Sequence, residues 1–203
     1  MFDEQMRLGK ERLLRPLARP LHFLAPWHLS LISLGMGVAS AIALAGQAYG
    51  LGFILWFLNR LFDGLDGTLA RSQGQKSDFG GYLDILIDFI VYALIPIGLV
   101  LGQPSEAAWL SLAMMLGVFY VNAASWMYLA AILEKRQRSQ TGQMTSVTMP
   151  AGLIGGTETI ILYTFFMLFP SFFISLFYLM TFLVVITIAQ RIHWAYHHLS
   201  SQT

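Results

Sequence analysis

Long apolar runs separated by short polar breaks dominate the chain after Pro26. Each run has roughly the 20 residues that a helix needs to cross a bilayer, and the breaks contain polar residues, glycine or proline. The pattern predicts six transmembrane helices, over residues 27–46, 48–71, 81–102, 105–133, 150–169 and 171–194. The expected fold is therefore an all-α, polytopic membrane protein with its six-helix bundle over residues 27–194.

The first 22 residues have a different pattern, in which leucines recur at spacings of three and four residues opposite basic residues. The leucines are Leu8, Leu13, Leu14, Leu17 and Leu21, and the basic residues are Arg7, Lys10, Arg12, Arg15 and Arg19. Such a pattern is typical of an amphipathic helix at an anionic membrane surface, and a solvated basic tail is the alternative. A cleaved signal peptide does not fit, because the basic residues interrupt any apolar core.

Composition agrees with a membrane protein. Of the 203 residues, 56% are hydrophobic and 11% are charged, whereas soluble domains have about 25% charged residues. The six helices use most of the chain, so we expect a single membrane domain over residues 1–203. The absence of cysteine excludes a disulfide scaffold and a thiolate metal site, and a net charge of +1 gives no sign of nucleic-acid binding.

The basic residues predict the orientation of the bundle. Eleven of the twelve Lys and Arg residues lie before the first helix, after the second and fourth helices, or near the C-terminus. The connections near Gly46, Gly102 and Pro170 have none. Cytoplasmic loops carry the excess of Lys and Arg, so both termini are expected in the cytoplasm, with the protein in a bacterial inner membrane.

Six charged residues fall inside the predicted spans: Arg60, Asp63, Asp66, Asp84, Asp88 and Glu158. Ionisable groups in a spanning helix are costly, so they normally face a polar cavity and mark function. The aspartates form two pairs, spaced three and four residues apart, and each pair shares one helix face.

The aspartates also match in depth. Asp63 lies eight residues before Arg71, and Asp88 lies eight residues after Gly80, which corresponds to about 12 Å of helix in both cases. In an antiparallel pair of helices the four carboxylates are therefore expected to meet. Converging carboxylates bind either protons or cations.

Oxygen ligands without His or Cys favour Mg²⁺, with Mn²⁺ or Ca²⁺ next. Two such ions would balance four carboxylates and would suit displacement at phosphorus. Arg71 and the glycines Gly64, Gly67 and Gly80 fit this chemistry, because they offer a phosphate-pairing fork and close backbone approach. A small transporter that moves protons or cations on the same aspartates, and a structural charge network, are the alternatives.

The segment from Asp63 to Asp88 resembles the signature D-x-x-D-G-x-x-A-R-x8-G-x3-D-x3-D of the CDP-alcohol phosphotransferase family. All eight fixed positions match over 26 residues. The resemblance implies a phospholipid-synthesising enzyme that transfers a phosphatidyl group from a CDP-linked lipid, usually CDP-diacylglycerol, to an acceptor alcohol and releases CMP.

The resemblance also implies residue roles. Asp63, Asp66, Asp84 and Asp88 would hold two Mg²⁺ ions, with Mn²⁺ as a substitute, and Asp88 would also take the proton of the acceptor hydroxyl. The positions expected at the nucleotide and diphosphate are Ser30, Gly67, Ala70, Arg71, Ser77 and Gly80. Gly80 is expected to allow close helix packing. Close helix packing is also expected at Gly35, Gly37, Gly50 and Gly52. These glycines also fit a homodimer, which the family often forms.

Two regions depart from the family pattern. Trp27 stands where family members commonly have Asn or Asp near the cytidine, and it fits either an interfacial aromatic belt or stacking on the base. The C-terminal part resembles the bacterial phosphatidylinositol-phosphate synthase branch in Gln190-Arg191-Ile192-His193, but Gly155-Gly156 and Glu158 replace a stretch with two arginines. The missing arginines disfavour a phosphorylated acceptor.

Glu158 and Arg191 remain as candidate acceptor-binding residues. An ion pair between them would either complete an acceptor pocket or only stabilise the bundle. An inactive relative of the family is a further alternative, against which the complete signature argues.

The orientation can be tested with a reporter fused after Thr203. We expect cytoplasmic reporter activity from this fusion, because the positive charges cluster on the side of the C-terminus. A matched fusion after Gly102 should report from the opposite side. Periplasmic activity of the C-terminal fusion would refute this topology.

Overall fold

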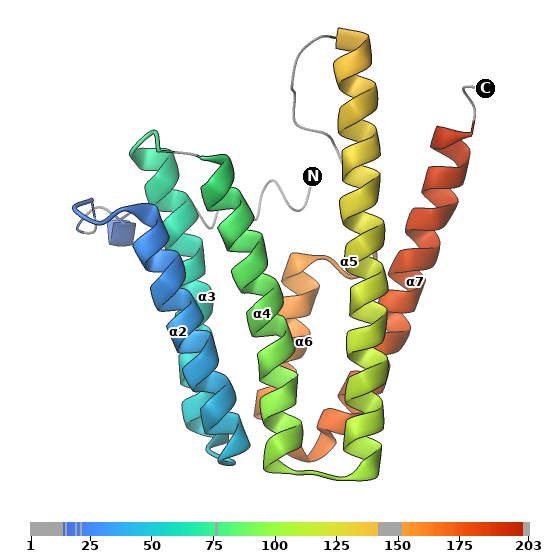
Figure 1. Ribbon diagram of the computed structural model, residues 1–203. Coiled ribbons are helices and arrows are strands. Elements are labelled where there is room, and N and C mark those ends of the chain that lie inside the picture. Colours follow the sequence, from blue (N-terminus) through green and yellow to red (C-terminus); the bar gives the residue numbers. More distant parts are fainter. Residues whose placement is uncertain are drawn as a thin grey trace. The chain divides into compact units, whose positions relative to one another are not determined.

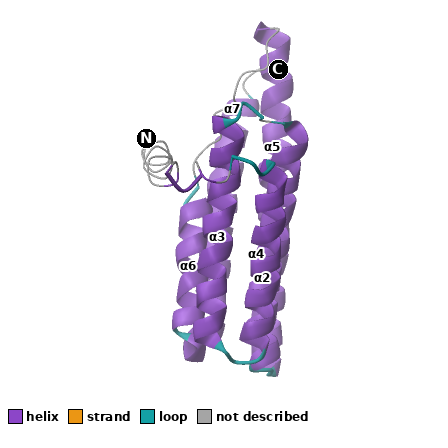
Figure 2. Ribbon diagram, turned by 90° about the vertical axis from the view of Figure 1, so that its left-hand side faces the viewer, coloured by secondary structure: helices purple, strands orange, loops and turns teal. Residues whose placement is uncertain are grey.

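The computed structural model describes residues 14, 16–18, 20, 22–75, 77–141 and 152–200, and the side chains of residues 137–141 are not described. All regular elements in these ranges are helices (Figure 2). They are α2 (Pro26–Ala45), α3 (Tyr49–Ser72), α4 (Asp78–Gly102), α5 (Glu106–Thr141), α6 (Gly156–Leu168), the 3-10 helix η2 (Pro170–Phe172) and α7 (Phe173–Leu199). The all-α prediction is confirmed for the described part of the chain.

The six predicted apolar runs each overlap one of these α-helices, with shifted ends. α5 continues to Thr141 rather than ending near residue 133. α6 begins at Gly156 and not near residue 150, because Glu158 accepts a hydrogen bond from the Gly155 N–H at 3.0 Å and caps the helix there. Sequence patterning identified these elements but not their ends.

Within the described residues, four helical segments are long and apolar enough to cross a membrane: Pro26–Ala45, Asp78–Gly102, Glu106–Arg136 and Pro170–Leu199. α3 has 24 residues but carries Arg60, Asp63, Asp66 and Arg71. α6 has only 13 residues, or roughly 20 Å of helix against a hydrocarbon core of about 30 Å. The predicted count of six spans therefore remains a prediction.

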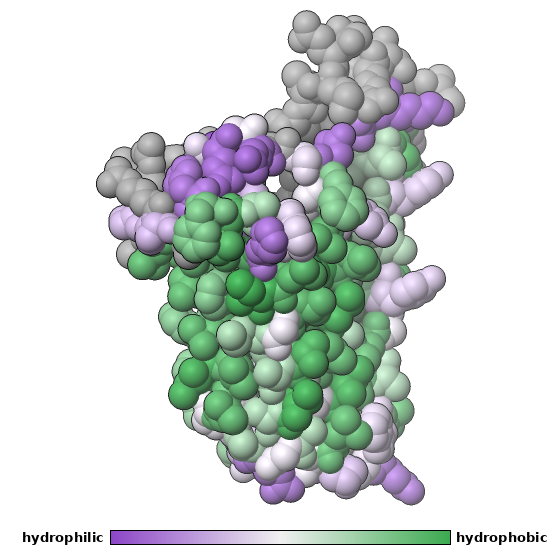
Figure 3. Space-filling view, turned by 60° about the vertical axis from the view of Figure 1, so that its left-hand side comes forward, coloured by the Kyte–Doolittle hydropathy of each residue, from purple (hydrophilic) through white to green (hydrophobic). Residues whose placement is uncertain are grey.

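The chain divides into two compact units, Met1–Pro104 and Ser105–Thr203. In the first unit, α2 packs against both α3 and α4 (Figure 1). Apolar side chains cover much of the surface along the helices, and hydrophilic residues gather toward the helix ends (Figure 3). This distribution is the one expected for helices in a bilayer.

Glycines allow α2 to approach its two neighbours closely. A Cβ atom on Gly98 of α4 would lie 2.4 Å from the Ala41 carbonyl oxygen of α2, and one on Gly102 would lie 2.5 Å from the Leu44 carbonyl oxygen. On α3, a Cβ on Gly52 would meet the Leu44 side chain at 2.6 Å. These glycines fix the spacing of α2 to α3 and α4.

Polar side chains connect the turn between α2 and α3 to the C-terminal end of α4. Gln47, in the turn after α2, has a φ of 60° and donates from Nε2 to the Gly102 carbonyl oxygen at 2.6 Å. Gln103 donates from Nε2 to the Tyr49 hydroxyl at 2.5 Å. The turn between α2 and α3 is thus attached to the end of α4.

Only part of the predicted N-terminal surface helix lies within the described residues. There, Leu14 and Ala18 are buried against Leu29, Leu65 and Leu69, while Leu17 is half-exposed. The described residues of this segment pack against α2 and α3 with one face, and the remaining predicted positions lie outside the described part.

In the second unit, α7 packs against α5 and α6. Aromatic rings fill its core: Phe166 lies 4.9 Å from Phe177 and 5.0 Å from Tyr163 between ring centroids. Arg136 of α5 donates to the Leu199 carbonyl oxygen at 2.9 Å, next to the end of α7.

We predict that Gly98→Ala destabilises the protein. The added methyl group would collide with the backbone of α2, at a cost of about 1–3 kcal/mol. The measurement is thermal unfolding of the purified protein in detergent. Gly35→Ala is the control, because no atom lies within 4 Å of the added Cβ; equal melting temperatures for the two variants would contradict this packing.

Candidate active site

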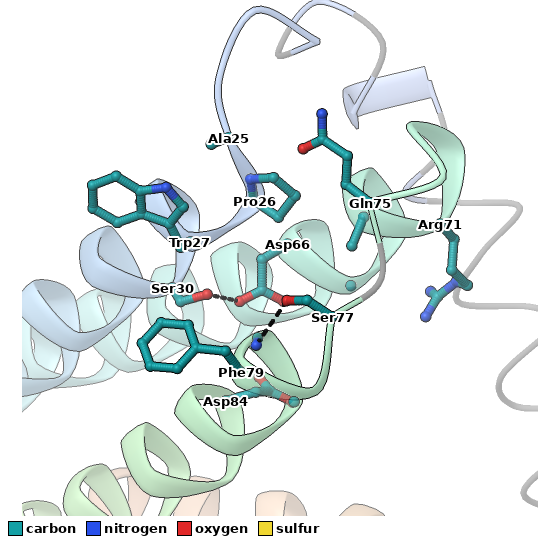
Figure 4. Close-up of a pocket in the computed structure, with 14 residues that line it drawn as sticks. Ala25, Pro26, Trp27, Ser30, Asp66, Arg71, Gln75, Ser77, Phe79 and Asp84 are labelled. Carbon is teal, nitrogen blue, oxygen red and sulfur yellow. Dashed lines mark hydrogen bonds between the residues drawn. The ribbon is translucent and has the colours of Figure 1, made fainter. Parts of the chain in front are cut away.

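A pocket of about 550 Å³ opens in the first unit, where α2 and α4 begin and α3 ends. In Figure 4, Trp27 and Phe79 lie at one side of the pocket and Gln75 and Arg71 at the other. All six residues predicted at the nucleotide line this pocket, together with two of the four aspartates. These eight residues are Ser30, Gly67, Ala70, Arg71, Ser77, Gly80, Asp66 and Asp84.

Asp66 is buried at the pocket wall with 6% of its surface exposed. The Ser30 hydroxyl of α2 donates to its Oδ2 at 2.6 Å, as Figure 4 shows. This short, charge-assisted bond holds the carboxylate toward the pocket and joins α2 to α3.

Ser77 also lines the pocket. Its hydroxyl oxygen accepts a hydrogen bond from the Gly80 N–H at 3.0 Å and so caps the N-terminus of α4. A Cβ atom on Gly80 would meet only the Ser77 hydroxyl among the described atoms, at 3.1 Å. Gly80 therefore makes room for the cap and the pocket. Gly80 was expected to allow close helix packing, but no described atom of another helix lies within 4 Å of a Cβ placed there.

The other two aspartates share one cation, the guanidinium of Arg60. Arg60 Nη1 donates to Asp88 Oδ1 at 2.8 Å and lies 3.9 Å from Asp63 Oδ2. Asp63 and Asp88 were expected to come close together, and an oxygen of each lies near this one atom, at 3.9 and 2.8 Å. The middle parts of α3 and α4 are thereby linked through the Arg60 side chain.

Arg60 is held on several sides. Its Nε donates to Asn59 Oδ1 at 2.7 Å, and its Nη1 also donates to the Tyr92 hydroxyl at 3.2 Å. The guanidinium carbon lies 4.9 Å from the Trp56 ring centroid and 5.1 Å from that of Tyr92. Nη2 is buried and has no hydrogen-bond partner in the described part.

Asn59 extends this network to α2. Its amide donates to the Ser33 carbonyl oxygen at 2.7 Å and to the Ser33 hydroxyl oxygen at 2.8 Å. Asn59 is fully buried, so these bonds satisfy polar groups in an apolar interior. Hydrogen bonds thus run from α2 through α3 to α4.

The aspartates fit a divalent cation in donor chemistry, because all four offer hard carboxylate oxygens. In the described part, however, no group of three His, Cys, Asp or Glu side chains is close enough to hold a metal ion. The carboxylates lie instead as Asp63 and Asp88 around Arg60, and as Asp66 and Asp84 on the pocket wall. Arg60 occupies the space between the first two.

The candidate acceptor residues of the second unit do not form the ion pair expected from the sequence. Arg191 Nη1 donates to the Oδ1 and the carbonyl oxygen of Asn122 on α5, at 2.8 and 3.1 Å. Glu158 caps α6 through the Gly155 N–H. Arg191 thus hydrogen-bonds to Asn122 and Glu158 to Gly155, and the two side chains do not pair with each other.

Sequence reasoning missed three polar or aromatic partners at these sites: Phe79 in the pocket, Tyr92 beside Arg60 and Asn122 beside Arg191. Two signals were available. Tyr92 lies one helical turn after Asp88, on the same helix face. Asn122 is a single amide in a long apolar run, and such a group must find a partner.

Known proteins resemble this chain along most of its length. A 36% identical relative over 176 residues is the inner membrane protein YnjF of Escherichia coli, with 85% of this chain and 84% of the relative covered. A shorter match, 43% identical over 44 residues, is the CDP-diacylglycerol–serine O-phosphatidyltransferase of Methanocaldococcus jannaschii; it covers 22% of each chain.

Solved structures share the fold. The phosphatidylinositol phosphate synthase of Mycobacterium tuberculosis with CDP-DAG bound superimposes with a TM-score of 0.66 at 23% identity, covering 91% of this chain and 94% of that one. The same enzyme with manganese and citrate gives a TM-score of 0.62 at 22% identity, covering 91% and 87%.

The family model for CDP-alcohol phosphatidyltransferases matches residues 23–196, across both units. The signature residues between Asp63 and Asp88 lie inside this match. The chain therefore belongs to the CDP-alcohol phosphatidyltransferase family and is a membrane transferase of phospholipid synthesis.

Proposed function

We propose that this protein transfers a phosphatidyl group from CDP-diacylglycerol to an acceptor alcohol and releases CMP, with Mg²⁺ as its cofactor. The observation that carries the proposal is the complete signature, whose nucleotide-side residues all line one pocket. The pocket's volume of about 550 Å³ suits a ligand of nucleotide size. A proton- or cation-coupled transporter is not favoured, because the family is one of transferases.

Each side of the pocket has a role in this reaction. Arg71 and the backbone around Gly67 and Gly80 are proposed to hold the diphosphate, since an arginine fork and exposed N–H groups pair with phosphate oxygens. Ser77, Ala70 and Ser30 complete the donor site. Trp27 lines the same pocket with its ring stacked on His28 at 3.8 Å, which supports a position beside the nucleotide.

Asp63, Asp66, Asp84 and Asp88 are proposed to hold two Mg²⁺ ions, for which Mn²⁺ would substitute. When bound, the ions would supply positive charge to the oxygens around the reacting phosphorus. This proposal draws on the carboxylate donor set and on the manganese in a solved structure of the same fold.

The transfer is a displacement at phosphorus. The acceptor hydroxyl oxygen forms a bond to the lipid-bearing phosphorus, the bond from that phosphorus to the CMP oxygen breaks, and CMP leaves with the electron pair. Asp88 is proposed to take the hydroxyl proton. Its position eight residues inside α4 from Gly80 puts it deeper than the nucleotide-side residues, toward the lipid-bearing end of the donor.

Glu158 and Arg191 stay proposed as acceptor-binding residues. Arg191 is buried, and its Nε has no partner within the described part. Since Gly155 and Gly156 stand where a phosphate-binding branch has arginine, we infer an acceptor without a phosphate group.

In the membrane, we infer that all six α-helices span, with α3 packed on α2 and α6 packed on α7. The pocket lies at the end that carries Arg71, so the active site and both termini would face the cytoplasm of a bacterial inner membrane. A homodimer is also proposed. Gly35 and Gly50 have no neighbouring atom within 4 Å that would block a second copy.

The test is CMP release by the purified protein from CDP-diacylglycerol, with and without Mg²⁺. Serine, inositol, glycerol phosphate, inositol phosphate, choline and a phospholipid are added singly as acceptors. Stimulation by one acceptor with Mg²⁺ supports the proposal and identifies the product. Ion flux through the reconstituted protein without CMP release would refute it.

We predict that Asp88→Asn lowers CMP release at least about 10²-fold, because the amide cannot accept the acceptor's proton. The variant should stay folded, as judged by size exclusion and thermal melting. Asp78→Asn is the matched control, since Asp78 is an exposed aspartate in the first turn of the same helix and does not line the pocket. Substantial CMP release by the Asp88 variant would remove the base assignment.

A further inference from the structure

The guanidinium of Arg60 lies within salt-bridge distance of two proposed metal ligands at once, Asp63 and Asp88. Only 9% of its side chain is exposed. A buried arginine between two carboxylates supplies the positive charge that they need in an apolar surrounding. Arg60 therefore contacts Asp63 and Asp88, the same two side chains that are proposed to bind the cation.

Arg60 and a divalent cation cannot both occupy this position. Arg60 Nη1 lies 2.8 Å from Asp88 Oδ1, whereas Mg²⁺ lies about 2.0–2.1 Å from its ligand oxygens. A cation bound to Asp63 and Asp88 together would lie between them, where Nη1 now lies 3.9 and 2.8 Å from their oxygens. Charge repulsion would add to the steric conflict.

The other contacts of Arg60 allow it to leave Asp88 without leaving its place on α3. Nε bonds to Asn59 on the same helix, and the flat guanidinium lies beside the rings of Trp56 and Tyr92. Neither interaction depends on Asp88. Nη2 has no hydrogen-bond partner among the described residues, so the contacts shown do not fix that side of the guanidinium.

We propose that Arg60 is a positioning residue that stands in for the divalent cation. It holds Asp63 and Asp88 together while no cation is bound, and it gives up Asp88 when the cation enters. The inference rests on the proposed metal-dependent function. It adds that cation binding and the Arg60–Asp88 ion pair exclude each other, so Asp88 is released from its salt bridge only in the loaded enzyme.

The test measures cation affinity rather than activity. Mn²⁺ is titrated into the purified, metal-free protein in detergent, and free Mn²⁺ is followed by electron paramagnetic resonance. Arg60→Gln should bind Mn²⁺ about tenfold more tightly than the wild type, because the competing charge is gone. The same variant should melt lower than the wild type in EDTA and gain more from added Mn²⁺.

The control is Arg136→Gln, which removes one positive charge from the second unit, where Arg136 bonds to the end of α7. Its Mn²⁺ affinity should equal that of the wild type. Tyr92→Phe is a milder variant for use if Arg60→Gln does not fold. It removes one hydrogen bond to Arg60 and should tighten Mn²⁺ binding about two- to tenfold.

The outcomes separate the two proposals. Unchanged or weaker Mn²⁺ binding by the Arg60 and Tyr92 variants, with a wild type that binds, overturns the role of Arg60 alone. Tighter binding without CMP release from any acceptor supports the role of Arg60 and refutes the proposed reaction. A wild type that binds no Mn²⁺ overturns both.

Discussion

Charge burial is the constraint on which the first unit depends. Asp63 and Asp88 lie deep in helices whose other residues are mostly apolar, and each needs a positive partner there. Arg60 supplies it without any ligand. The same requirement explains why Asn59, Trp56 and Tyr92 surround the guanidinium. These residues hold the long Arg60 side chain in one position and add few further buried polar groups.

The central position of α2 follows from this requirement. α3 and α4 must leave room between them for the pocket and for Arg60, so neither can be held mainly by the other. α2 packs closely on both through glycines such as Gly98, and it bonds to α3 through Ser30 and Ser33. The close apolar packing of α2 against α3 and α4 thus supports the open polar site in this unit.

The sequence predicted the parts of this arrangement that depend on periodicity and fixed spacing. Helical repeats locate α2 to α7, and the depth of Asp63 and Asp88 follows from counting along two helices. It does not decide whether Arg60 offsets these carboxylates or reaches a phosphate, because Arg60 can extend toward several partners from one helix position. The first residue of α6 was not predicted for a related reason. A local cap at Gly155, rather than hydrophobicity, sets where this helix begins.

The two proposed roles of Asp88 are compatible only in a fixed order. One carboxylate oxygen of Asp88 accepts a charge-assisted hydrogen bond from Arg60 Nη1 at 2.8 Å, so that oxygen is not available to an acceptor hydroxyl. A cation held by Asp63 and Asp88 in place of Arg60 would supply positive charge that favours ionisation of an acceptor hydroxyl. Asp88, released from Arg60, would then be available to take the hydroxyl proton. Cation entry would therefore come before acceptor activation, and the salt bridge would keep Asp88 from reacting until the site is loaded.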